Sequence, residues 1–138
     1  MKKILSLTLV LLMMLSVCTF TASCGDDTEE QMLYTEDTVL GNGNKTVILV
    51  VEHSNGKKVT FTIKTDKTIL ADALLEHKLI EGENDTYGLY VKKVNGITQD
   101  YNKDRTYWAL YIDGEYSMTG VSSVELTEGT VYTYKVST

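Results

Sequence analysis

The clearest alternation of apolar and polar positions lies in residues 46–64. Residues 46–53 (TVILVVEH) are apolar on both faces, which is typical of a central strand. In residues 58–64 every second position is apolar, as in a strand with one solvated face: Val59, Phe61 and Ile63. Asn55 and Gly56 between the two segments tolerate a positive φ and favour a tight turn. The pattern therefore predicts a β-hairpin.

Helical spacing replaces the alternation after residue 68. A helix is predicted from about Ile69 to Leu79, with Asp66 or Thr68 as its N-terminal cap. Charged residues occupy one side of this helix. The apolar residues fall on the other side and are Ile69, Leu70, Ala73 and Leu74. We expect this apolar side to cover one face of the sheet.

The C-terminal half adds strands separated by polar segments. A polar loop is predicted over 81–85, and a polar excursion over 98–104. The predicted strands are 87–94, 107–112 and 130–136. The order of strand, strand, helix and further strands predicts an α+β fold, in which one helix crosses a β-grasp-like mixed sheet.

The first 27 residues have the pattern of an export signal. Lys2 and Lys3 precede the apolar run 4–20, which is marginal for a membrane span of ~20 residues. Thr21-Ala22-Ser23-Cys24 then resembles the lipobox of bacterial lipoproteins, although such boxes usually have Leu where Thr21 stands. The resemblance implies a signal peptide over 1–23 and a lipid on the Cys24 thiol. The alternative is ordinary secretion, with Cys24 as a free thiol.

A spacer is predicted between the lipid and the folded domain. Residues 24–45 combine acidic side chains with Gly and Asn and lack sustained periodicity, which is typical of a flexible tether. The domain is then expected over 46–138. Cleavage before Cys24 would place the protein on the extracytoplasmic face of the bacterial cell membrane, held there by the lipid.

The net negative charge of the chain argues against two classes of binding partner. The chain has 13 cationic and 19 acidic residues, and removal of Lys2 and Lys3 with the signal takes the formal charge from −6 to −8. An acidic domain argues against nucleic-acid binding, which needs a basic face. It also argues against adhesion to anionic lipid. The lipid on Cys24 is therefore expected to hold the membrane by itself.

Several motifs after residue 67 point to one family. They are Gly88-Leu89-Tyr90, Val94-Asn95-Gly96, the run from Tyr107 to Tyr116, Gly120-Val121 and the run from Leu126 to Val131, with the helix segment 68–75. These stretches resemble bacterial extracellular domains related to the C-terminal β domain of transcobalamin and intrinsic factor. The resemblance implies a β-grasp-like domain and a cobalamin or other corrinoid as ligand. In the animal carriers a separate helical barrel already holds the cobalamin, and the 138 residues contain no counterpart of that barrel.

Catalytic and metal chemistry find little support in the sequence. His53 and His77 are 24 residues apart and lack recognisable ligand spacing, so we expect surface histidines with satisfied hydrogen bonds, no metal and no cofactor. No nucleophile elbow or phosphate-binding glycine loop is present. We therefore expect a protein that is not an enzyme. A hydrolase acting on cell-wall material is the weakest alternative.

Aromatic residues are the best candidates for ligand binding. Alternation places Trp108 on one face of the 107–112 strand, and Tyr107 and Tyr111 on the other. A core position is favoured for Trp108, whereas the two tyrosines suit a binding face and the core about equally. The loop that contains Tyr116 and Met118 either contacts a ligand or is a plain connector, in which Met118 or Val121 closes the sheet edge. The candidate set is thus Tyr107, Trp108, Tyr111, Tyr116 and Met118.

These features predict a surface-anchored, non-catalytic binding lipoprotein. Its expected ligand is a small molecule such as a corrinoid. The alternative is a protein-interaction module that docks onto a larger surface or transport complex.

Overall fold

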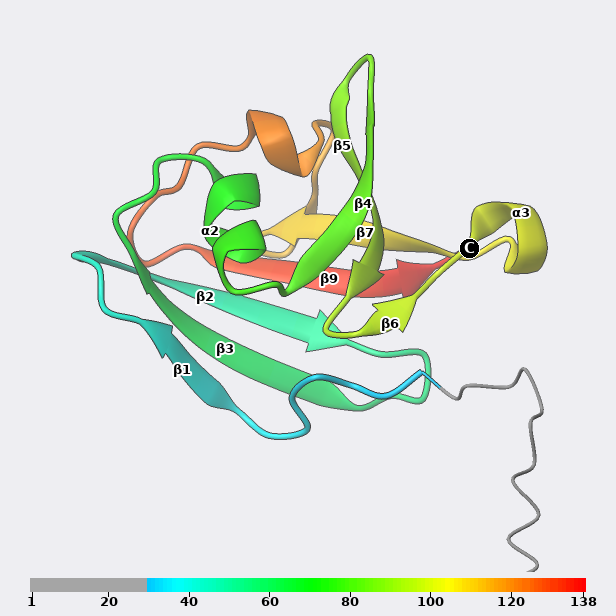
Figure 1. Ribbon diagram of the computed structural model, residues 1–138, viewed down its shortest axis with the longest axis horizontal. Coiled ribbons are helices and arrows are strands. Elements are labelled where there is room, and N and C mark those ends of the chain that lie inside the picture. The colour runs from blue at the N-terminus through cyan, green and yellow to red at the C-terminus, as the bar shows by residue number, and fades with distance from the viewer. Residues whose placement is uncertain (1–29) are drawn as a thin grey trace, which may run out of the picture.

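Two sheets of unequal size make up the described part of the chain, residues 30–138 of the computed structural model (Figure 1). The larger sheet contains, in spatial order, β1 (Thr38–Gly41), β3 (Lys58–Thr65), β2 (Lys45–Glu52), β9 (Val131–Ser137), β7 (Tyr107–Ile112) and β8 (Glu115–Tyr116). The smaller sheet contains β4 (Ile80–Asp85), β5 (Gly88–Val94) and β6 (Ile97–Thr98). The helices are α2 (Leu70–Glu76), α3 (Tyr101–Asp104) and the 3-10 turn η1 (Val121–Ser123).

The predicted hairpin is confirmed and lies at the centre of the larger sheet. β2 pairs antiparallel with β3 and parallel with β9, so the sheet is mixed. Val47, Leu49 and Val51 of β2 are fully buried on one face, while the apolar residues between them are half-buried on the other. The partial cover on the second face agrees with the apolar run on both faces of this segment.

Helix α2 covers one face of the larger sheet together with the β4–β5 hairpin and η1 (Figure 1). Leu70, Ala73 and Leu74 are fully buried in the core beneath it. The helix is shorter than predicted, because it ends at Glu76 and Lys78 adopts a left-handed conformation with φ 56°. The two predicted caps were also wrong, since Ile69 occupies the N-cap position and no side chain caps the helix there.

The predicted polar loop over 81–85 is instead the strand β4. It pairs along its whole length with β5, with a bulge between Glu81 and Gly82. Lys93 lies 3.9 Å from Glu81, and Lys92 lies 3.2 Å from Glu83. These cross-strand ion pairs stabilise charged side chains in β4. The strand lacks the alternation of apolar residues by which a strand is predicted from sequence.

The tether prediction is corrected for residues 30–45, which pack on the domain. β1 pairs parallel with β3, and the Asp37 carboxylate accepts a hydrogen bond from the Thr60 amide over 2.8 Å. Residues 30–37, named here the N-terminal strap, run along the body before β1. The domain therefore begins well before the predicted residue 46. The predicted signal peptide, residues 1–23, and the lipidation site Cys24 lie outside the described residues.

The α+β class is confirmed by this arrangement of mixed sheets and helix. The predicted polar excursion begins at the end of β6 and contains the single turn α3. The connection after β7 contains β8 and η1. Within residues 30–138, no helix is long and apolar enough to cross a membrane.

Candidate binding groove

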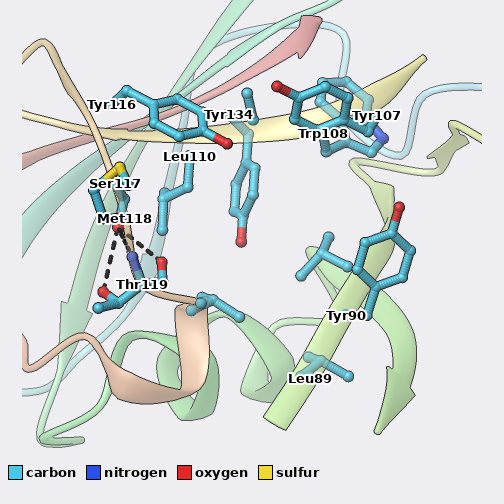
Figure 2. Close-up of a pocket in the computed structure, with 14 residues that line it drawn as sticks. Leu89, Tyr90, Tyr107, Trp108, Leu110, Tyr116, Ser117, Met118, Thr119 and Tyr134 are labelled. Carbon is cyan, nitrogen blue, oxygen red and sulfur yellow. Dashed lines mark hydrogen bonds between the residues drawn. The ribbon is translucent and has the colours of Figure 1, made fainter. Parts of the chain in front are cut away.

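A groove of about 260 Å³ opens where β5, β7 and the loop after β8 meet (Figure 2). It is named here the tyrosine groove, and none of the residues that line it carries a formal charge at neutral pH. They are Leu89, Tyr90 and Val91 of β5, Tyr107, Trp108, Ala109 and Leu110 of β7, Tyr116 of β8, Ser117, Met118, Thr119, Gly120, Val121 and Tyr134.

The groove exists because β7 is only partly covered on its outer side. β8 pairs with Tyr111 and Ile112 alone, which leaves the first half of β7 without a strand beside it. The backbone N–H of Asp113 donates to the carbonyl of Val131 on the β9 side over 2.8 Å. The backbone carbonyl of Leu110 accepts from the N–H of Ser117 on the outer side, also over 2.8 Å. Backbone groups alternate along a strand, so the N–H and C=O of Trp108 also point outward, towards the groove.

Trp108 forms part of the floor and belongs to the core. It is 5% exposed, and its indole nitrogen donates to the backbone carbonyl of Ile97 over 3.0 Å. This agrees with the core position that the sequence favours. The buried indole is a rigid surface against which the more exposed side chains of the groove are held.

Tyr134 supplies a floor residue that the sequence did not single out. It lies opposite Leu110 in the β7–β9 pairing, and its ring points into the groove from β9 (Figure 2). No hydrogen bond joins its hydroxyl to another side chain or backbone group of residues 30–138. A tyrosine phenol is protonated at neutral pH, and burial raises the pKa of Tyr134 further, so its hydroxyl can donate to a ligand.

The rim consists of two exposed side chains on the loop side of the groove. Tyr116 is 50% exposed and Met118 is 90% exposed. A hydrogen bond with Tyr107, slight burial and the neighbouring phenols of Tyr107 and Tyr111 together raise the pKa of Tyr116. The Ser117 hydroxyl donates to the Thr119 carbonyl over 2.8 Å, which sets the turn that presents Met118.

The structure brings four of the five predicted binding residues together. Tyr107, Trp108, Tyr116 and Met118 line the groove, whereas Tyr111 lies outside it and borders a separate hollow with Lys135. The Tyr111 ring meets the Tyr116 ring edge to face, with 5.7 Å between centroids, and so supports the rim from behind. Their role in binding a ligand stays a prediction.

The side of the groove formed by β5 was not found from the sequence. Leu89, Tyr90 and Val91 reach it only because the β4–β5 hairpin folds back over the larger sheet (Figure 1). Their positions in a strand could be predicted, but the strand's approach to β7 depends on packing between distant segments.

The expectation for the histidines was wrong. His53 is only 6% exposed, and its Nδ1 has no hydrogen-bond partner within the described residues. The Nε2 of His77 is likewise buried without one. Within residues 30–138, no group of three or more His, Cys, Asp or Glu side chains is arranged to hold a metal ion.

Residues 67–138 match the family described as "Domain of unknown function (DUF4430)". The match spans more than half of the chain, and the protein therefore belongs to this family. No curated protein matches the chain.

Two solved structures show where the fold recurs. A "putative metal binding protein" from Ruminococcus gnavus ATCC 29149 has a TM-score of 0.65 and 24% identity, over 68% of this chain and 97% of that chain. Haptocorrin in complex with cobinamide (Cbi) has a TM-score of 0.52 and 24% identity, over 70% of this chain. The match covers only 27% of haptocorrin. At this identity the likeness establishes the fold, and the expected transcobalamin-like fold is confirmed.

Proposed function

We propose that the protein is a non-catalytic binding module that captures a neutral small molecule in the tyrosine groove. The observation that carries this proposal is an open groove with an uncharged lining, in which Tyr116 and Met118 are exposed over the buried Trp108 and Tyr134. Burying a charged ligand in such a lining would cost desolvation energy without a partner charge. A ligand with a flat apolar face and peripheral polar groups suits it better.

A corrinoid is the ligand class we assign first. Tyrosine rings provide rigid apolar area with a polar tip, and methionine adapts to an irregular outline. The support is the transcobalamin-like fold, shared with a haptocorrin whose structure contains Cbi.

The alternative is docking onto a partner protein, and the size of the groove favours it. At about 260 Å³ the groove is smaller than the ~300–1,000 Å³ usual for sites that enclose a drug-sized ligand. A groove of this size suits a side chain or short segment of a partner protein better than a fully enclosed small molecule. Cross-linking in cells through a photoreactive group at position 118 tests this alternative: a discrete heterologous product supports docking, and self-products alone contradict it.

Anchoring completes the proposal. We place the protein on the outer face of a bacterial membrane, held by lipid on Cys24 after removal of residues 1–23. The support is the lipobox-like sequence Thr21-Ala22-Ser23-Cys24. Mass spectrometry of the membrane fraction tests it directly, because lipid on Cys24 is expected there, and a soluble product with a free thiol would contradict it.

Calorimetry with cyanocobalamin tests the binding proposal. We expect heat of binding and a raised melting temperature for the mature chain, both lost in the double variant Tyr116→Ala/Met118→Ala. Val39→Ala is the matched control, because Val39 is an exposed apolar residue on β1, at the opposite edge of the larger sheet. Absence of heat and of thermal shift up to about 1 mM would remove corrinoid capture.

A further inference from the structure

Leu33 and Tyr34 of the N-terminal strap are hydrogen-bonded to one buried residue, Asn95. The Leu33 amide donates to the Asn95 backbone carbonyl over 3.0 Å. The Tyr34 amide donates to Asn95 Oδ1 over 2.9 Å, and Asn95 Nδ2 donates to the Tyr34 carbonyl over 2.9 Å. Asn95 is fully buried in the turn between β5 and β6, whereas Tyr34 is half-buried, so the two side-chain bonds are partly shielded from water. Loss of such bonds inside the protein costs more than loss of solvated ones.

The same amide also faces His53. Asn95 Nδ2 lies 3.3 Å from His53 Nε2. The backbone of Tyr34 fixes the orientation of the Asn95 side-chain amide. The Tyr34 N–H requires Oδ1 of Asn95 as acceptor, and the Tyr34 carbonyl requires Nδ2 of Asn95 as donor. The nitrogen of Asn95 can therefore only donate to His53, and Nε2 must accept. His53 is thus neutral in the latched state, with its proton on the buried Nδ1, which has no partner among the described residues.

A proton added to His53 cannot be accommodated in this arrangement. Imidazolium carries N–H on both nitrogens, so two donors would face each other across the contact with Asn95. If the Asn95 amide turned over to offer its oxygen, both side-chain bonds to Tyr34 would be lost instead. The first outcome pushes the Asn95 amide away from His53 and so displaces the side chain that holds the strap, and the second breaks both side-chain bonds to Tyr34.

The surroundings of His53 do not favour the charged form. Burial, followed by the positive charge of Lys57 in the β2–β3 turn, lowers the pKa of His53. Glu52 is engaged by Lys58 at 3.8 Å and by Lys135 at 3.7 Å. The groups that face His53 from the elements packed against it are uncharged. The Trp108 ring of β7 meets the imidazole edge to face, with 5.7 Å between centroids, and Ile97 of β6 lines a cavity beside His53. Glu30 of the strap lines that cavity too.

Glu30 is held at a second point. Its carboxylate accepts hydrogen bonds from the Thr98 amide and hydroxyl, each over 2.6 Å. Burial opposes its ionisation, but these bonds and the charge of Lys93 outweigh that effect and lower the pKa of Glu30 from its ordinary value. This contact therefore persists to more acidic pH. Between about pH 4.5 and 6.5, His53 is the group of the two whose protonation weakens the strap.

We propose that His53 is an acid-sensitive latch: its protonation releases the N-terminal strap from Asn95. The latch itself requires neither a ligand nor a lipid. Because Glu30 stays bound to Thr98, release from Asn95 frees residues 31–36 as a loop that remains attached at Glu30 and at β1.

The experiment combines two readouts on the wild-type chain between pH 8 and pH 5. Nuclear magnetic resonance follows the protonation of His53, and amide hydrogen exchange gives the protection factors of Leu33 and Tyr34. We expect both protection factors to fall by about tenfold or more, with a midpoint that coincides with the His53 titration. Trp108, the single tryptophan, should change its fluorescence over the same range. Unchanged protection, or midpoints that differ, would overturn the latch.

Two variants make the assignment specific. His53→Gln keeps an acceptor for Asn95 but cannot titrate, so protection at Tyr34 should stay constant from pH 8 to pH 5. His77→Gln removes the other histidine and should retain the wild-type transition. A transition that survives in His53→Gln, or disappears in His77→Gln, would contradict the proposal. If His53→Gln does not fold, the wild-type comparison of midpoints still decides. Because no readout uses ligand or membrane, failure of the latch is distinct from failure of the binding proposal.

Discussion

The indole nitrogen of Trp108 donates to the backbone carbonyl of Ile97 over 3.0 Å, which ties β7 of the larger sheet to β6 of the smaller one. The same ring forms part of the groove floor and meets His53 edge to face. One side chain thus joins the two sheets, the proposed ligand site and the proposed latch.

Replacing Trp108 by Phe should lower the free energy of unfolding by roughly 1–3 kcal/mol. The Ile97 carbonyl loses its donor, and a buried polar group without a partner costs about that much. Urea unfolding measures the change. Tyr87→Phe is the control, since Tyr87 is strongly exposed and its change should stay within about 0.5 kcal/mol. Equal stability of the two variants would mean that the Trp108–Ile97 bond does not hold the sheets together.

Helix α2 offers a direct test of the core through two adjacent leucines. Leu74 is fully buried beneath the helix, whereas Leu75 is 43% exposed. Leu74→Ala should cost roughly 2–5 kcal/mol of stability, because it leaves a cavity as well as losing apolar burial. Leu75→Ala should cost much less. Similar melting temperatures for both variants would speak against the packing of α2 on the sheet.

Local patterns were sufficient for the elements whose stabilising partners are close in sequence. The β2–β3 hairpin was predicted because alternation and an Asn-Gly turn occur together within 20 residues. β4 was not, because its side chains are charged and its pairing with β5 is visible only in the fold. The strap was assigned to a tether for a similar reason. Tyr34 finds its partner Asn95 at a separation of 61 residues, and no local signal reports such a contact.

Some residues of the tyrosine groove could likewise be predicted from the sequence, whereas others are placed there only by the fold. Tyr107, Trp108, Tyr116 and Met118 come from one continuous stretch of the chain, so their aromatic and sulfur side chains could be grouped from sequence. Tyr134 reaches the groove through strand pairing and burial, which place its ring opposite Leu110. Tyr111 was included from alternation, but the turn after β7 brings Tyr116 in front of it.

Alkaline pH should destabilise the protein through Tyr134. Burial raises the pKa of its phenol above the ordinary value of 10, so the folded state holds a proton that the unfolded state releases. Stability is therefore fully present below pH 10 and is lost as the pH rises above it. Urea midpoints between pH 9 and pH 11 measure this loss. It should be smaller in Tyr134→Phe, and an identical slope in wild type and variant would show that Tyr134 is not the group responsible.

The central claim is that the tyrosine groove is where the ligand binds. The most direct measurement is the change in amide chemical shifts when cyanocobalamin is added to the ¹⁵N-labelled mature chain. The account predicts the largest changes in residues 89–91, 107–110 and 116–121, with little change in β1 and β3. Shifts confined to β1 and β3, or an unchanged spectrum at about 1 mM ligand, would contradict it.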